Sequence, residues 1–139
     1  MEFVGRRMMT KRELSQYYYL QREIKRQYEK IQELEAKAQA QSPSLSGMPG
    51  NAGVSDKVGQ YSAEIADLQA LMELNIRKSW PLLARLQRYI NDIPDSLTRQ
   101  IFWLRHAECK SWQQVANEVG GGNTADSCRK IHDRYLLNQ

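Results

Sequence analysis

The segment from Lys11 to Gln41 constrains the fold more than any other feature of the chain. It contains no glycine or proline, and its apolar residues recur at alternating spacings of three and four, as on one face of a helix. Charged residues fill the remaining positions, which predicts a long amphipathic helix that needs a partner along one seam only. The apolar stripe consists of Leu14, Tyr17 or Tyr18, Ile24, Tyr28, Ile31, Leu34 and Ala38.

A segment rich in proline, glycine and serine follows at 41–59. Its turn-forming residues predict a flexible linker at 42–55, and Ser55 or Asp56 is placed to cap a second helix. That helix repeats the spacing of the first. Two such helices can fold back as an antiparallel hairpin or can pair with another chain as a coiled coil. The second stripe consists of Val58, Tyr61, Ile65, Leu68 and Met72.

Two further breaks are expected before the C-terminal region. Pro81 predicts a restart or a kink, because proline cannot donate to the helical ladder but is tolerated in a first turn, and a third helix then runs to Ile90. The segment 91–97 supplies a turn and a new helix cap at Asp95 or Ser96. No segment alternates as a strand does, so the fold class is all-α.

The breaks divide the chain into domains. Residues 10–90 are expected to form the helical hairpin or coiled-coil region, with its linker inside, and residues 95–139 a separate helix-turn-helix domain. Residues 1–9 look unlike the rest and are expected to be a disordered segment or a misassigned start.

Composition narrows the class of protein. The formal net charge is +4 at pH 7, which permits binding to nucleic acid without requiring it. Two cysteines cannot build a disulfide framework, and no apolar run is long enough for a membrane span or a signal peptide, so we expect a cytoplasmic protein with reduced thiols. No nucleophile elbow, P-loop or dinucleotide fingerprint occurs, so we expect neither an enzyme nor a cofactor.

The last part of the chain reads as three short helices. In the first two, Leu97, Ile101, Leu104 and Val115 are expected on inner faces, and Ser111 caps the second helix. Other inner residues are Phe102, Ala116 and Val119.

The glycines at 120–122 can take positive φ values and end the second helix. Asn123 or Thr124 then caps the last helix, with Asp126 favourable in its first turn. At about 100° per residue, one face of the last helix is apolar and the opposite face is charged. The apolar face carries Cys128, Ile131 and Tyr135, and the charged face carries Asp126, Arg129, Lys130, Asp133 and Arg134, with Ser127 at its edge.

That charged face has two interpretations. It is either the solvated side of a helical bundle or the surface of a recognition helix that enters the major groove of DNA. Arginine and lysine can donate to guanine or phosphate, and Asp126 could accept from cytosine. Residues 95–139 carry six basic against five acidic residues, which weighs against strong binding, and periodicity alone leaves both interpretations open.

Residues 95–136 resemble region four of bacterial sigma factors and, more closely, a family of small phage-borne sigma-factor-like regulators. The resemblance rests on DSLTRQIFWLRHAECK, then Ser-Trp-x-x-Val-Ala at 111–116, then a final helix with the pattern R-x-H-x-x-L. The linker and the tyrosine-rich first helix are similar as well, so the resemblance extends from about Met9 onward. It implies a DNA-binding transcription regulator of phage or prophage type, acting in the cytoplasm of a bacterial host, with the last helix in the major groove.

The resemblance also implies which residues approach DNA. Arg99 and Arg105 match arginines of the family's first helix. His106 stands where an aromatic residue is usual, Cys109 where glycine is common, and the turn before the last helix is about two residues longer than the pattern. The full expected set of DNA-binding residues is Ser111, Gln113, Gln114, Thr124, Asp126, Ser127, Arg129, Lys130, Asp133 and Arg134.

Double-stranded DNA is therefore the expected partner, together with a second copy of the chain through the N-terminal helices and, as a further partner, RNA polymerase. A small-terminase-like DNA-packaging protein and a polymerase-binding adaptor that reads no bases are alternatives. The pairs His106/Cys109 and Cys128/His132 could hold zinc in principle, but their spacing is no standard finger and Cys128 suits a small core position. We therefore expect no metal site.

Overall fold

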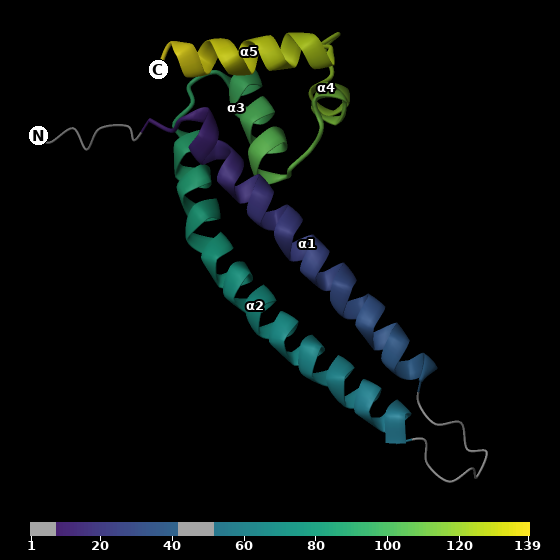
Figure 1. Cartoon of the computed structure of the whole chain (residues 1–139). Coiled ribbons are helices and arrows are strands. Elements are labelled where there is room, and N and C mark those ends of the chain that lie inside the picture. Colours follow the sequence, from purple (N-terminus) through teal and green to yellow (C-terminus); the bar gives the residue numbers. More distant parts are fainter. Residues whose placement is uncertain (1–7, 42–51) are drawn as a thin grey trace, which may run out of the picture. The chain divides into compact units, whose positions relative to one another are not determined.

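The structure is a computed structural model that describes residues 8–41 and 52–139, with the side chains of 52–55 excepted. Every regular element in these residues is a helix (Figure 1), which confirms the all-α fold class. The expectations for residues 1–7, and for the linker at 42–51, lie outside the described residues. The elements are α1 (Lys11–Ala40), α2 (Ala52–Asn91), α3 (Ser96–Phe102), a π-helical turn η1 (Trp103–Ala107), α4 (Trp112–Val119) and α5 (Ala125–Leu137).

Helix α2 differs from its prediction at two points. It begins at Ala52, so Ser55 and Asp56 lie inside its first turns and neither is the N-cap. The last proline of the linker segment is Pro49, and nothing after it prevents a helical backbone. The helix also continues through Pro81 without a restart, because the φ of proline is helical and the packing of Leu86 and Ile90 beyond it stabilises the continuous form.

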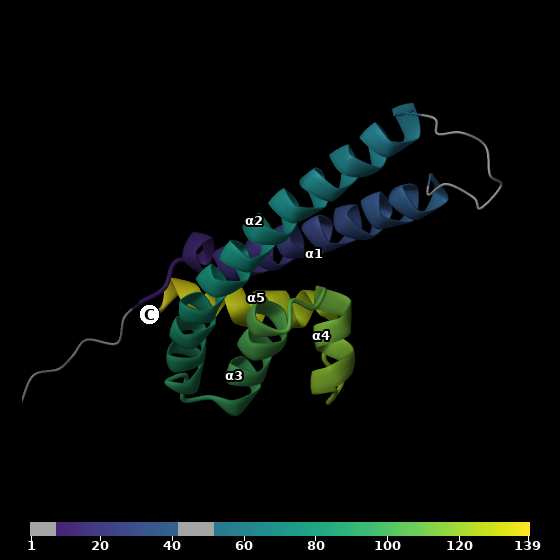
Figure 2. The same cartoon turned by 90° about the horizontal axis from the view of Figure 1, so that it is seen from below.

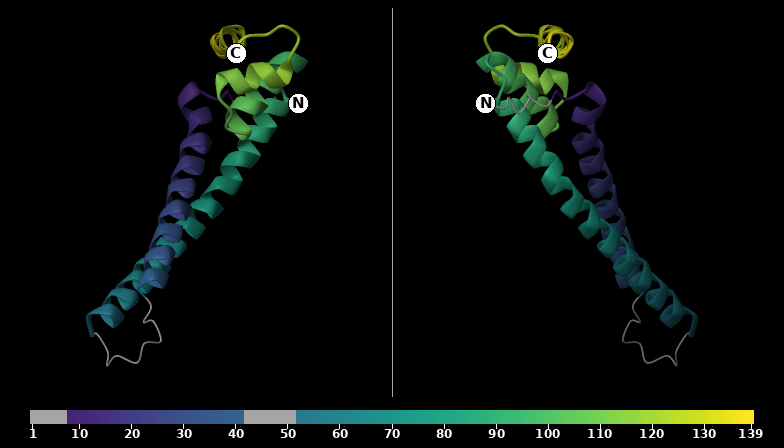
Figure 3. Two further views of the ribbon diagram at one scale, coloured as in Figure 1. Left: turned by 90° about the vertical axis from the view of Figure 1, so that its right-hand side faces the viewer. Right: turned by 90° about the vertical axis from the view of Figure 1, so that its left-hand side faces the viewer.

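The helices contribute to two compact units. The hairpin unit comprises Gln21–Lys78, in which the two helical segments run antiparallel (Figure 3), as the hairpin alternative predicts. Ile31 and Leu34 are its buried apolar residues. The side chain of Asn75 donates from α2 to Glu23 (3.1 Å) and to Gln27 (3.2 Å) on α1, so a polar contact interrupts the apolar seam.

The C-terminal unit contains residues 79–139 together with residues 8–20. Helices α3 and α4 both lie against α5 (Figures 1 and 2). This compact unit is larger than the segment 95–139 expected from the turn at 91–97. The reason is that the buried cluster around Phe102 draws on the first turns of α1 and on the end of α2, with Met9, Leu14, Leu86, Ile90 and Ile93 as its other members.

Local capping fixes the ends of the three short helices. The Asp95 side chain accepts from the Thr98 amide at the start of α3, and capping boxes pair Ser111 with Gln114 and Thr124 with Ser127. Asp95, Ser111 and Thr124 are each among the caps predicted from the sequence. Because both members of a capping box satisfy free amide groups, the boundaries of α4 and α5 are set by nearby residues.

The backbone between these helices needs left-handed conformations. Gly120, Gly121 and Gly122 have φ values of 64°, 64° and 75°, as expected for glycines that end a helix. Cys109 adopts a φ of 59°, a conformation that glycine takes more readily.

Candidate nucleic-acid interface

The inner side of α5 is held by a cluster of rings. Phe102 is fully buried and stacks on His132, with ring centroids 4.6 Å apart and an interplanar angle of 27°. Trp112, at the start of α4, meets the same histidine edge to face at 5.1 Å. Tyr135 packs against Phe102 at 5.3 Å. Aromatic contacts of this kind add to the energy of burial, so α5 is fixed along its length to α3 and α4.

Two buried histidines join η1 to α5 within that cluster. The Nε2 atoms of His106 and His132 lie 2.7 Å apart, and Nδ1 of His132 lies 2.9 Å from the carboxylate of Asp133. A carboxylate can only accept, so the bonding pattern assigns the Nδ1 proton to His132. Its Nε2 then accepts the Nε2–H of His106. The arrangement is satisfied when both rings are neutral.

The surroundings favour that neutral state. Burial, followed by the charges of His132, Arg105 and Lys11, lowers the pKa of His106 to about 3. Burial also lowers the pKa of His132, although its contact with Asp133 works in the opposite direction. The sequence prediction placed Cys128, Ile131 and Tyr135 on the inner face and missed His132. The spacing of four between Cys128 and His132 was the available signal that this histidine shares the inner face.

The outer side of α5 carries the charged residues as predicted. Arg129, Lys130 and Arg134 are exposed, whereas Cys128 is fully buried with Ile101 and Val115 on the opposite side. Arg129 and Lys130 each form an ion pair with Asp126. For Arg134, no ion pair occurs within residues 8–41 and 52–139. The structure therefore brings three cations together on one exposed helical face.

Several other predicted DNA-binding residues have structural partners. Ser111 and Gln114 bond to each other in the capping box of α4, and Thr124 and Ser127 do so at α5. Gln113 is exposed, with its amide bonded to Asn117 in the next turn. These residues lie at the starts of α4 and α5, where side chains and free amides can meet phosphate.

Asp133 is partly exposed, with a side chain 43% accessible to solvent, and it is engaged by other residues of the protein. It accepts from His132 and lies 3.6 Å from the ammonium group of Lys11. Its carboxylate therefore links α5 to the beginning of α1 and supports the neutral histidine pair. The sequence placed Asp133 on the same face as Arg129 and Arg134, but the structure separates its role from theirs.

The link between η1 and α4 is braced by residues that the sequence analysis did not connect. The Arg105 guanidinium lies 4.6 Å from the centre of the Trp112 ring and donates to the carbonyl of Lys110 (2.9 Å). Lys110 in turn forms an ion pair with Glu118 on α4. Arg105 is thus engaged in orienting α4.

The cysteines and histidines do not meet as a metal site. His106 and His132 bond to each other, while Cys128 belongs to the separate apolar cluster with Ile101, Leu104 and Ala116. Within the described parts of the chain, no group of three or more potential ligands is placed to hold a metal ion. Cys128 has the small core role that its position suggested.

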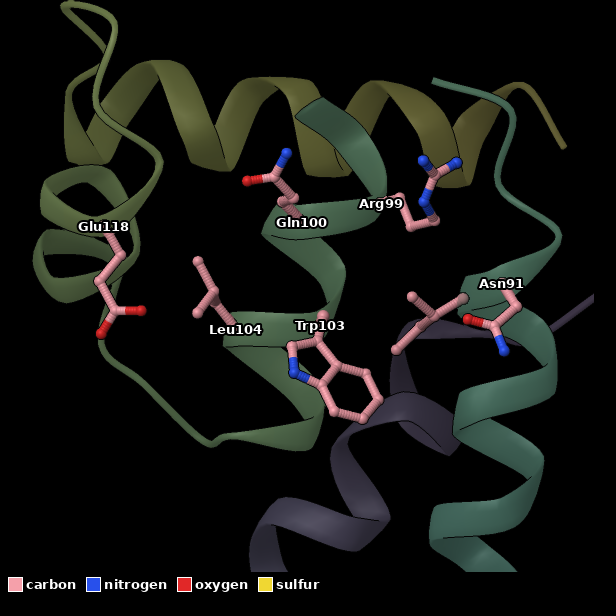
Figure 4. A pocket seen from close by; sticks show the side chains of 7 residues that line it. Asn91, Arg99, Gln100, Trp103, Leu104 and Glu118 are labelled. Atoms are coloured by element: carbon pink, nitrogen blue, oxygen red, sulfur yellow. The ribbon is translucent and has the colours of Figure 1, made fainter. Parts of the chain in front are cut away.

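A hollow of about 350 Å³ opens between the end of α2, the continuous segment α3–η1 and α4 (Figure 4). Trp103, Leu104 and Ile90 give it an apolar lining, and Arg99 lies near its edge. The Arg99 guanidinium donates to the carbonyl of Ile93 (2.8 Å) and braces the turn before α3. Because its charged groups serve the protein's own contacts, this hollow is a weaker candidate than the exposed face of α5.

Comparisons with known proteins add no family. No family model matches the chain, and neither the curated proteins nor the solved structures contain a significant match. Among the helices in the described residues, none combines the length and the apolar character needed to cross a bilayer. The candidate interface therefore rests on the geometry of α3, α4 and α5.

Proposed function

We propose that the chain is a sequence-specific DNA-binding transcription regulator of phage or prophage type, with α5 as its recognition helix. The main support for the proposal is that α5 has one buried side and one exposed basic side. One side is fixed to α3 and α4 by Cys128, His132 and the rings around Phe102, and the other side presents Arg129, Lys130 and Arg134. A rigid helix with an exposed basic face is what insertion into a major groove requires.

Binding begins with the phosphates in this mechanism. Arg129, Lys130 and Arg134 neutralise phosphate charge and release condensed counterions, while the start of α4 positions the unit on the backbone. Bases are then read by the residues at the start of α5, among them Asp126 and Arg129. Three cations support only a shallow salt dependence, with a slope of about −3 at most, so one unit alone binds weakly.

A second copy of the chain supplies the missing affinity. The hairpin unit exposes Tyr28, Leu71 and Leu74, each about half accessible to solvent, beside a narrow buried seam. Pairing two hairpin units would cover these residues and would present two recognition helices to one DNA molecule, which raises the effective concentration of the second. Light scattering at micromolar concentration should therefore report a dimer, and a strict monomer would exclude this part of the proposal.

The decisive measurement is DNA binding by a variant that lacks two cations of α5. Selection of bound sequences from random duplexes first identifies a site, and fluorescence anisotropy then measures affinity for it. We expect Arg129→Ala/Lys130→Ala to weaken binding by tenfold or more, because about two phosphate or guanine contacts are lost. The matched control is Lys25→Ala/Arg26→Ala, which removes the same charge from exposed positions in the hairpin unit and should bind nearly as the wild type does.

The outcomes separate the proposal from its alternatives. Equal loss in both double variants would indicate a general effect of net charge rather than an interface on α5. Ring-shaped oligomers bound to a packaging site would indicate a small-terminase-like protein. Intact regulatory activity in Arg129→Ala/Lys130→Ala would indicate an adaptor that docks on RNA polymerase and reads no bases.

A further inference from the structure

The first turn of α5 carries an acidic residue that engages both neighbouring cations. In Asp126, Oδ1 lies 2.6 Å from an Nη atom of Arg129, and Oδ2 lies 2.9 Å from Nζ of Lys130. The three side chains are between 54% and 67% exposed, so the whole triad faces solvent. Both oxygens of the carboxylate are thus occupied by the cations that the proposed function assigns to DNA.

Asp126 reduces the combined charge of Arg129 and Lys130 from +2 to +1 at the start of the helix. The pKa of Asp126 is held below its ordinary value by its bond to Lys130, with a smaller contribution from Arg129, so the carboxylate is ionised at neutral pH. A phosphate that approaches Arg129 or Lys130 must displace this carboxylate and meets its negative charge. Asp126 therefore competes with the DNA backbone for the same donors.

We propose that Asp126 is the residue that sets specificity, acting as an intramolecular competitor of DNA phosphate. On arbitrary DNA the carboxylate stays paired with Arg129 and Lys130, and binding is weak. At a site that offers a cytosine amino group, the carboxylate accepts from that group and releases the cations to phosphate or guanine. This inference rests on the proposed function and names the base chemistry that the helix would recognise.

The exchange of Asp126 from its two cations to a cytosine amino group requires little free energy. Exposed ion pairs of this spacing are weak, each altering an equilibrium by a factor of about five or less. A wrong base offers the carboxylate no new donor, so it stays paired with Arg129 and Lys130 and remains close to phosphate, where like charges repel. Discrimination then arises because arbitrary DNA provides no donor that can replace Arg129 and Lys130 at the Asp126 carboxylate. Many specific interfaces reject a wrong partner in this way, through a group that the wrong partner repels or leaves unsatisfied.

The test compares wild-type protein with Asp126→Asn, which keeps the size of the side chain and removes its charge. Anisotropy is measured with two labelled duplexes, one of arbitrary sequence and one obtained by selection, over a salt series from about 50 to 200 mM. For the arbitrary duplex we expect affinity to rise by about tenfold and the slope of log K against log salt to steepen by about one to two. The ratio of selected to arbitrary affinity should fall.

The chain offers a closely matched control in Glu33. Its carboxylate holds Lys30 (3.5 Å) and Lys37 (3.0 Å) at the same kind of helical spacing, but in the hairpin unit. Glu33→Gln removes the same charge and frees two cations, and it should leave the salt slope for both duplexes unchanged. Asp126→Ser serves as a second variant, and circular dichroism verifies that all variants are folded.

The results distinguish the inference from the function on which it rests. If wild type binds the selected duplex and Asp126→Asn changes neither slope nor ratio, the competitor role is refuted while DNA binding stands. If neither protein binds either duplex even at low salt, the proposed function fails and the inference fails with it. A steeper slope in Glu33→Gln equal to that in Asp126→Asn would also refute the inference, because freed cations anywhere would then have the same effect.

Discussion

The two compact units of this chain achieve order by different means. The C-terminal unit buries Phe102, Leu86, Ile101 and other large side chains completely, and it adds the paired histidines to that core. The hairpin unit buries Ile31 and Leu34, interrupts its seam at Asn75, and leaves Leu71 and Leu74 exposed. A broad core can fix the direction of a recognition helix, whereas a narrow seam is suited to a helix pair that has a further partner.

The tryptophans allow each unit to be followed separately. Trp80, Trp103 and Trp112 all belong to the C-terminal unit. Tryptophan fluorescence therefore reports on that unit, and far-ultraviolet circular dichroism reports on the helices of both. A comparison of the two signals during urea unfolding measures how differently the units respond to a change.

The largest expected effect follows from Phe102→Ala. This ring contacts His132, Tyr135 and Tyr89, and its removal should lower the free energy of unfolding by about 3 to 5 kcal/mol. A loss of that size is a large part of the stability of a small domain, so the fluorescence transition should shift to much lower urea.

The matched change in the hairpin unit is Leu34→Ala. We expect it to lower the free energy of unfolding measured by circular dichroism by about 2 kcal/mol, at the low end of the range for such substitutions. It should move the fluorescence transition less than Phe102→Ala does. If both variants shift the fluorescence transition equally, the contrast between a broad core and a narrow seam does not hold.

Acid is expected to act mainly on the C-terminal unit, which contains both histidines. The pKa of His106 falls to about 3 on folding, from an unfolded value of about 6.5. The unfolded chain thus binds a proton that the folded chain excludes. Stability is full above about pH 6.5 and declines as the pH falls toward 3, by at most about 1.4 kcal/mol per pH unit for each histidine.

Urea unfolding followed by fluorescence at about pH 7 and pH 5 measures this decline. His106→Phe replaces the imidazole with an aromatic ring that does not titrate. It should reduce the difference between the free energies of unfolding measured at the two pH values. A wild-type protein equally stable at both would show that the histidine pair accepts a proton in place.

The smallest effect is expected from Asn75→Leu in the seam of the hairpin unit. The substitution removes the hydrogen bonds to Glu23 and Gln27, which are worth about 1 kcal/mol each, and it gains a similar amount through apolar contact. We expect a net change within about 1 kcal/mol by circular dichroism. A loss of more than about 2 kcal/mol would identify the polar contact as the main support of the hairpin.

Local features of the fold were predictable because their causes lie within a few residues. The caps at Asp95, Ser111 and Thr124 depend on a side chain and an amide three positions away. The exposed basic face of α5 follows from helical periodicity. The ion pairs of Asp126 with Arg129 and Lys130 also follow from spacings of three and four.

Most of the failures originate in contacts between distant residues, although the start of α2 has a local cause. Turn-forming residues near position 55 and the proline at 81 suggested two helix starts, but α2 runs from Ala52 through Pro81. The position of Asp133 depends on His132 and on Lys11 at the other end of the chain, which no local pattern records. Tertiary packing outweighs local preference wherever the buried surface is large.

Local sequence patterns predict the helical fold, the starts of the short helices and the side of α5 that carries its cations, because periodicity and capping act over single turns. The role of the ends of α1 and α2 in completing the core around Phe102 follows from tertiary packing alone. So do the hydrogen bond between His106 and His132 inside that core and the contacts of Asp133 with His132 and Lys11. Most of the partners in those contacts are separated by tens of residues, and burial of a common surface is what brings them together.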